Sequence, residues 1–230
     1  GSTAAALPHD SAGHAPTHCT MDTFLHAHAT HPDWRYALEL ANAQLRAQRS
    51  SQRQRGGGAN LGFVYFSDLY AAQAEELLQA LHHDWPGVAW VGSTGVGVCG
   101  SGVEYFDEPA LVLMLAQLPA GSFQVFSGTH PLSLAAHTAL VHADPSTPEL
   151  PELVAEMSER TASGYLFGGL ASARSQSLQM AEGVFRGGLS GVAFTQQVGL
   201  ISRVTQGCTP VGPVRRVTAA NEHLVLELDG

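Results

Sequence analysis

The sequence predicts an α/β protein in which two duplicated β-α-β-β-β halves pack into one mixed-sheet domain. Two observations lead to this prediction. Short runs that are apolar at nearly every position are typical of strands buried on both faces, and helical patterns follow them. The same order of strand, helix and strand also occurs twice along the 230 residues, which indicates an internal repeat.

The N-terminal residues 1–32 are expected to form a disordered leader. The first twenty are rich in Ala, His, Pro, Ser and Thr without periodicity, and Gly1-Ser2 resembles a cloning remnant. The domain, residues 33–230, is expected to begin at Asp33, a good N-cap residue. Apolar residues at helical spacing from Trp34 to Leu45 predict the first helix, and the polar stretch 46–60 predicts a loop.

The first predicted half covers about residues 61–118. It opens with a buried strand at 61–66, and Ser67-Asp68 can then start a helix that ends at Pro86-Gly87. A second strand, 88–91, runs into a Gly-rich turn. Two further strands are expected, around 102–105 and 110–116.

The second predicted half covers about residues 137–200 and repeats this order. A strand at 140–143 precedes a helix that begins at Pro148, and a strand at 165–167 runs into a second Gly-rich turn. An offset of 77 residues aligns Phe63 with Leu140 and Gly92 with Gly169. The later strands align at an offset of 81, which implies a four-residue insertion. C-terminal strands are expected within 201–230.

Composition excludes several classes of function. The formal net charge of −9 argues against nucleic-acid binding. All 11 basic residues are arginine, so a Walker A loop, a Schiff-base lysine and a protein-kinase site are excluded. No apolar run reaches the roughly 18 residues of a membrane helix. Cys19, Cys99 and Cys208 form neither a zinc pattern nor a disulfide framework, so we expect reduced thiols in a cytoplasm and no metal site.

Four segments in order resemble the FIST sensory domain: Trp90–Gly95, Phe167–Ser172, Gly207–Pro213, and the ending from Val217 to Gly230. The resemblance is to the N-terminal section of such proteins and covers about Asp33 to Gly230. It implies an input module of bacterial signal transduction that binds a small ligand, such as an amino acid or a similar small anion. The alternative that it implies is a haem-binding nitric-oxide sensor acting on a histidine kinase or a cyclic-di-GMP enzyme.

The two Gly-rich turns are the candidate ligand site. If the halves pack about a pseudo-twofold axis, the turns face each other across one cleft, where backbone amides and hydroxyls suit an anionic group. Arg174 would supply a bidentate partner. The alternative is that the glycines only allow tight strand exits and close packing. The candidate ligand-binding residues are Gly92, Ser93, Thr94, Gly169, Ser172, Arg174 and Cys208.

No residue is predicted to be catalytic. Ser93 lacks the glycine two positions earlier that a nucleophile elbow requires, because Val91 stands there. Cys208 lies in a turn fixed by Gly207 and Pro210, where turn packing competes with thiol or haem ligation. If haem binds, the candidate axial ligands within the domain are His130, His137 and His142, each of which can equally be an ordinary core or surface histidine.

Overall fold

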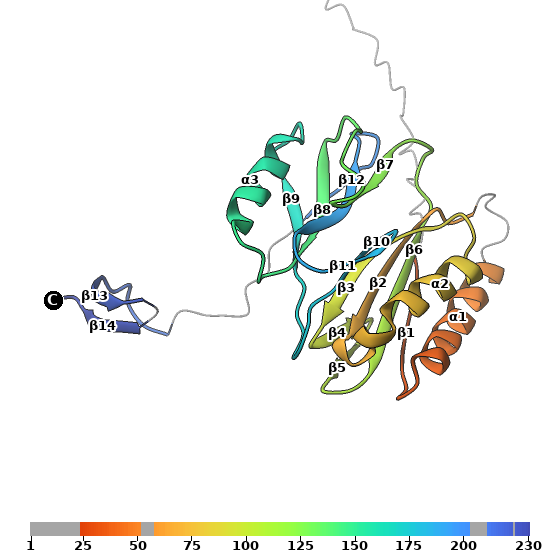
Figure 1. The fold of residues 1–230 in the computed structure, drawn as a ribbon, viewed down its shortest axis with the longest axis horizontal. Helices are drawn as coiled ribbons and strands as arrows, with labels where there is room; N and C mark the ends of the chain where they lie inside the picture. The colour runs from red at the N-terminus through yellow and green to blue at the C-terminus, as the bar shows by residue number, and fades with distance from the viewer. Residues whose placement is uncertain (1–23, 52–57, 203–210, 223) are drawn as a thin grey trace, which may run out of the picture. The chain divides into compact units, whose positions relative to one another are not determined.

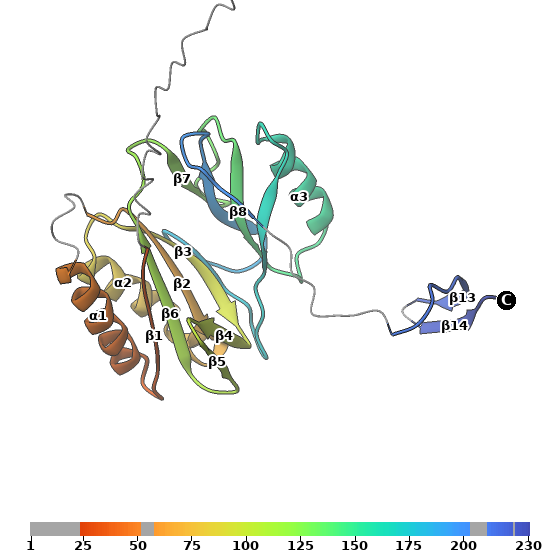
Figure 2. The same ribbon diagram turned by 180° about the vertical axis from the view of Figure 1, so that it is seen from behind.

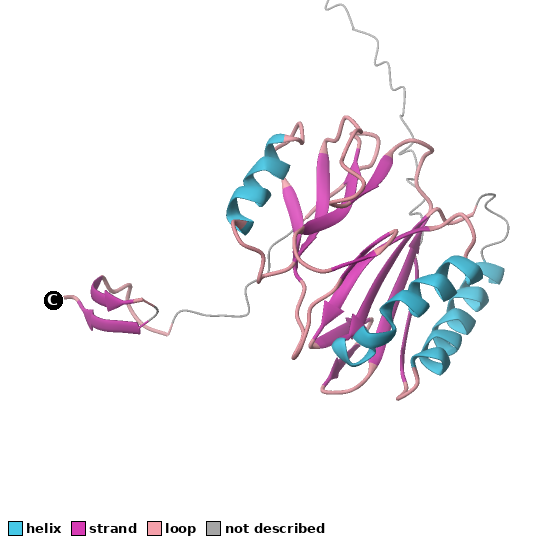
Figure 3. Cartoon of the chain, viewed as in Figure 1, coloured by secondary structure: helices cyan, strands magenta, loops and turns pink. Residues whose placement is uncertain are grey.

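The computed structural model describes residues 24–51, 58–202, 211–222 and 224–230, and Cys208 therefore lies outside the described residues. The chain divides into a main unit, Gly1–Val198, and a C-terminal unit, Gly199–Gly230. Each unit is described by itself below (Figure 1). The main unit contains helices, short loops and mixed sheets, so the predicted α/β, mixed-sheet class is confirmed (Figure 3).

The larger sheet of the main unit has six strands in the order β1-β6-β2-β3-β10-β11. Strands β2 and β3 are parallel, and the other neighbouring strands are antiparallel. Helices α1 and α2 cover one face of this sheet (Figures 1 and 2). The bounds are β1 Leu25–Thr30, α1 Trp34–Ser51, β2 Leu61–Ser67, the 3₁₀ helix η1 Asp68–Gln73, α2 Ala74–Asp84, β3 Ala89–Gly95, β6 Ala110–Ala116, β10 Gln179–Ala181 and β11 Val184–Phe185.

The smaller sheet has four strands in the order β7-β12-β8-β9, with β8 and β9 parallel. Helix α3 packs on it, because Met157 of α3 shares a hydrophobic cluster with Val141 of β8. A separate hairpin, β4-β5, lies beside the larger sheet on the face opposite α1 and α2 (Figure 2). The bounds are β4 Gly97–Gly100, β5 Val103–Phe106, β7 Phe123–Phe126, β8 Thr138–Ala143, α3 Leu150–Glu159, β9 Leu166–Leu170 and β12 Leu189–Phe194.

Strand β1 corrects the predicted start of the folded part. It lies within residues 1–32, which were expected to be a disordered leader, yet it pairs with β6 along its whole length. Its inward residues are Leu25, Ala27 and Ala29, and two of these three carry so little apolar surface that the alternation gave a weak signal. The side chains of Gln44 and Gln48 on α1 hydrogen-bond the backbone of β1 at His28 and His26.

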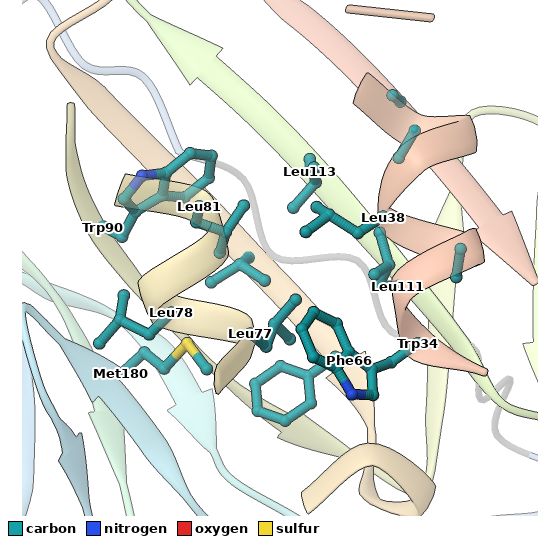
Figure 4. Packing of buried hydrophobic residues seen from close by; sticks show 14 of the residues in the cluster. Trp34, Leu38, Phe66, Leu77, Leu78, Leu81, Trp90, Leu111, Leu113 and Met180 are labelled. Atoms are coloured by element: carbon teal, nitrogen blue, oxygen red, sulfur yellow. The ribbon is translucent and has the colours of Figure 1, made fainter. Parts of the chain in front are cut away.

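The core of the main unit lies between the larger sheet and its two helices. Trp34 and Leu38 of α1 and Leu77 and Leu81 of α2 are buried against strand residues such as Trp90 (Figure 4). The predicted helices at 34–45 and after Ser67 thus exist, although α1 continues to Ser51 through part of the stretch predicted as loop. Burying such side chains stabilises the fold by roughly 1.5–3 kcal/mol each.

The strand order of the first half occurs again in the second. The strand order β1-β6-β2-β3 corresponds to the strand order β7-β12-β8-β9. In each of the two, the first two neighbouring pairs are antiparallel and the third pair is parallel. Each half has more strands than the predicted β-α-β-β-β, because a short hairpin follows β3 and another follows β9. The shared order supports the internal duplication, which stays a prediction.

The Gly-rich segments are strands, which corrects the prediction that they form turns. Strand β3 continues to Gly95 and β9 to Leu170. The register also changes one alignment. Val64 and Val141 are equivalent at the offset of 77, and Val64 pairs with Gly92 whereas Val141 pairs with Gly168. Gly168, rather than Gly169, therefore occupies the position equivalent to Gly92.

The C-terminal unit contains one antiparallel hairpin, formed by β13 (Val217–Asn221) and β14 (Leu224–Leu228). An ion pair between Arg215 and Asp229, with an N–O distance of 2.9 Å, links the two ends of the hairpin. Within the described residues of both units, no helix is long and apolar enough to span a membrane.

Candidate functional site

A cavity of about 450 Å³ lies in the main unit where β3 and β4 approach β8 and β9. Both predicted Gly-rich segments contribute to its wall. The residues that line it are Tyr65, Ser93, Thr94, Gly95, Gly97, Val98, Cys99, His142, Gly168, Gly169, Leu170 and Ser172. Ser93, Thr94, Gly169 and Ser172 were named from the sequence, so the structure brings these four together.

Two pairs of neighbouring residues form the centre of the wall. Tyr65 on β2 is opposite Ser93 on β3, and His142 on β8 is opposite Gly169 on β9. Residues paired across neighbouring strands project to the same face of a sheet. Each sheet therefore presents one such pair to the cavity.

The two pairs meet through a hydrogen bond between Tyr65 and His142. The Tyr65 hydroxyl lies 3.0 Å from His142 Nε2, and the rings meet edge to face. The two residues are 77 positions apart, which is the offset of the predicted repeat. Contact between equivalent residues is expected where a pseudo-twofold axis passes between two halves, so this geometry supports the predicted packing.

Burial keeps both members of this pair uncharged at neutral pH. It lowers the pKa of His142 to about 4 and raises the pKa of Tyr65 to about 12. His142 is only 2% exposed, and its Nδ1 has no hydrogen-bond partner among the described residues. The hydroxyl proton of Tyr65 is thus available to donate to Nε2.

The hydroxyls of Thr94 and Ser172 hold the wall together. Thr94 Oγ1 accepts a hydrogen bond from the Leu178 N–H at 2.9 Å, and the backbone N–H of Thr94 donates to the Leu178 carbonyl. Ser172 Oγ accepts from the Val96 N–H at 3.0 Å. These bonds tie the segment after β9 to β3. The Thr94 hydroxyl both donates and accepts and is therefore not free as predicted, whereas the Ser172 hydroxyl accepts one bond and keeps its proton for a further partner.

Ser93 differs from these two residues. It is 7% exposed, and its hydroxyl makes no hydrogen bond to another described residue. Among the described residues, the fully buried polar side-chain atoms without a partner are Trp34 Nε1, Trp90 Nε1 and His142 Nδ1, and the Ser93 hydroxyl is not one of them. It is therefore open to the cavity that Ser93 lines.

Arg174 does not line the cavity, which corrects its predicted role as a partner for an anion. Its guanidinium Nη1 and its backbone N–H each donate to Asp68 at 2.6 Å, and Nη2 pairs with Asp107. The Asp68 side chain is 4% exposed, so its charge requires this partner. Sequence spacing could not reveal the competition, because Asp68 and Asp107 lie far from Arg174 along the chain.

Gly92 supports the site from behind. A Cβ atom at this position would lie 1.7 Å from the Val64 carbonyl oxygen, so a side chain there would separate β2 from β3. Gly92 is absent from the cavity wall. The competing interpretation, that the glycine serves close packing, is the one that its geometry favours.

The three candidate haem ligands do not meet in the structure. His142 lines the cavity, whereas His130 and His137 do not, and the Nε2 atom of His142 is bonded to Tyr65. His130 Nδ1 instead bonds the Thr129 hydroxyl at 3.1 Å. Within the described residues, no cluster of three His, Cys, Asp or Glu side chains could hold a metal ion.

Tyr65, Cys99 and Gly168 also line the cavity, although they were not predicted from the sequence. Tyr65 had a usable signal, because the offset of 77 aligns it with His142. Cys99 had none, and the structure exposes it. A second cavity of about 580 Å³ was also unforeseen; it contains Asp144 and Arg186, and no ion pair links that arginine to another described residue.

A cavity that carries several polar groups between two halves of one α/β unit is typical of a small-molecule binding domain. The model of the FIST N domain family matches residues 60–230, which is more than half of the chain. The chain therefore belongs to the FIST N domain family, whose domains are sensory domains of signal transduction that bind small ligands. This is a sensory and not a catalytic family. No curated protein matches the chain.

Proposed function

We propose that the cavity between β3–β4 and β8–β9 binds a small molecule, and that its occupancy is the input signal of this sensory domain. The observation that supports this most directly is the Ser93 hydroxyl, which is open to the cavity although the residue is 7% exposed. A hydroxyl that is open to a cavity and has no partner among the described residues can form hydrogen bonds with a bound ligand.

The strands that form the wall indicate that the ligand joins the halves. The wall combines β2 and β3 of the first half with β8 and β9 of the second. A ligand that contacts all four strands can shift the equilibrium between two arrangements of the halves. The size of the shift is set by the difference in its affinity for the two arrangements. We propose that a histidine kinase or a cyclic-di-GMP enzyme in the cytoplasm receives this change.

Thermal-shift measurements on the whole chain test the proposal. The panel holds the amino acids, small carboxylates and their uncharged counterparts. A ligand at ten times its Kd stabilises the fold by about 1.4 kcal/mol, which raises Tm by about 3–6 °C in a protein of this size. If no compound of the panel shifts Tm, the proposal fails.

A blocking variant assigns the binding to this cavity. Gly169 lines the cavity, and a Cβ atom there would meet no atom within 4 Å, so Gly169→Val should fold while filling the space. Gly58 has equally open surroundings outside the cavity, so Gly58→Val is the matched control. We expect the ligand-induced shift to disappear in the first variant and to persist in the second.

The haem alternative is weaker at this site. His142 is the one candidate ligand in the wall, and an iron atom would have to displace Tyr65 to reach its Nε2. We therefore expect haemin titration to leave the absorption spectrum of free haemin unchanged. A Soret band that is lost in His142→Gln would instead support the haem alternative.

A further inference from the structure

The cavity wall carries no formal charge. Among the described residues that line it there is no Asp, Glu, Lys or Arg. Its one titratable imidazole, His142, is neutral near pH 7 because burial lowers its pKa to about 4. A charged group that binds against this wall finds no opposite charge to compensate for the water it gives up, which is costly.

The polar groups of the wall are instead neutral donors and acceptors. Tyr65 has one hydroxyl proton, and His142 Nε2 is its neighbour at 3.0 Å. In the tautomer that carries its proton on Nδ1, Nε2 accepts the hydrogen bond that the Tyr65 hydroxyl donates. The Tyr65 oxygen can then still accept a hydrogen bond, and the Ser93 hydroxyl can donate or accept.

The rest of the main unit shows that this neutrality is local. Arg174, which lies two residues after the wall residue Ser172, is held by Asp68 and Asp107. The second cavity, by contrast, contains both Asp144 and Arg186. A ligand with a carboxylate or an ammonium group would find an opposite charge there and not between β3–β4 and β8–β9.

We propose that the cavity between β3–β4 and β8–β9 selects an uncharged polar ligand whose carbonyl, amide or hydroxyl group is bound by Ser93 and the Tyr65–His142 pair. This inference rests on the proposed function, because it assigns the chemistry of the ligand that the same cavity binds. The sequence predicted a ligand with an anionic group such as a carboxylate. The ligand inferred here instead binds through an uncharged group, which needs no cation.

Matched pairs of compounds that differ in one charge test the inference. N-acetylglycinamide is compared with N-acetylglycine, and lactamide with lactate, by calorimetric titration of the whole chain at pH 7. Binding is assigned to this cavity only if Gly169→Val abolishes it and Gly58→Val does not. We expect each amide to bind at least about tenfold more tightly than its acid.

Two conservative variants test the assigned residues. Ser93→Ala and Tyr65→Phe each remove one hydroxyl and should weaken binding of the amides by about three- to tenfold. Ser50→Ala and Tyr36→Phe remove the same groups from α1, away from the cavity, and should leave binding unchanged.

The outcomes separate the two proposals. Acids that bind in this cavity as tightly as their amides, or amide binding that is indifferent to both Ser93→Ala and Tyr65→Phe, would overturn the inferred ligand class alone. If neither the amides nor the broader panel binds, the inference and the proposed function both fail.

Discussion

At the scale of single residues, the central feature of the site is a histidine that remains neutral. His142 is 2% exposed and receives one hydrogen bond from Tyr65, while Nδ1 has no partner among the described residues. An unsatisfied buried donor of this kind costs about 1–3 kcal/mol.

The stability of the fold should depend on pH through His142. Burial lowers its pKa from 6.5 to about 4, so between these values the unfolded chain binds a proton that the folded chain excludes. The contribution is complete above about pH 6.5 and is lost as pH falls towards 4. It amounts to about 3 kcal/mol, and His142→Gln should flatten the dependence by this order.

Urea denaturation between pH 7 and pH 4.5 measures this effect. The control is His83→Gln, which changes an exposed histidine at the end of α2 and should leave the pH dependence of the wild-type protein intact. Parallel curves for the wild-type protein and His142→Gln would show that His142 titrates normally.

At the scale of elements, the parallel strand pairs depend on two glycines. A Cβ atom at Gly92 would lie 1.7 Å from the Val64 carbonyl oxygen, and one at Gly168 would lie 1.9 Å from the Val141 carbonyl oxygen. Gly168 also has a φ of +134°, a conformation that other residues rarely adopt. Both strand pairs thus approach more closely than any side chain permits.

Neighbouring glycines on β9 should consequently respond very differently to substitution. Gly168→Ala places a methyl group on backbone and should reduce the free energy of unfolding by about 3 kcal/mol. Gly169→Ala enters open space and should change it by no more than about 0.5 kcal/mol. Chemical denaturation of the two variants decides the point, and equal losses would contradict the close approach at Gly168.

At the scale of the whole molecule, the fold extends beyond the residues that identify the family. The family match begins at residue 60, whereas Trp34, Leu38 and Leu45 of α1 are buried in the core of the main unit. Strand β1 covers one edge of β6 along its whole length. An exposed strand edge is a site of aggregation, so β1 and α1 are integral to the domain.

Truncation from the N-terminus tests this boundary. A chain that begins at Phe24 should keep a cooperative thermal transition, because all described elements remain. A chain that begins at Asp33, where the sequence analysis placed the start of the domain, loses β1 and should melt at a clearly lower temperature or aggregate. Circular dichroism and gel filtration compare the two, and equal melting would show that β1 is dispensable.

The sequence determined the class of the fold, the family and two segments of the site. Long apolar runs predicted β2 and β8. A strand that is buried on both faces is apolar at nearly every position, so its own residues are enough to identify it. The repeat then placed Ser93, Thr94, Gly169 and Ser172 in one wall. Strand β1 was missed because its small alanines give only a weak apolar pattern. It forms a strand because it pairs with β6, a contact that is distant in sequence.

Only the tertiary structure decided which of these residues are free to bind a ligand. Arg174 and Thr94 have side chains suited to an anion, and each is committed to partners distant in sequence, whereas the Ser172 hydroxyl accepts one bond and can still donate. Tyr65 meets His142 only because the two sheets face each other. Local sequence fixes which groups a segment carries, whereas the contacts between segments fix which of those groups remain unsatisfied.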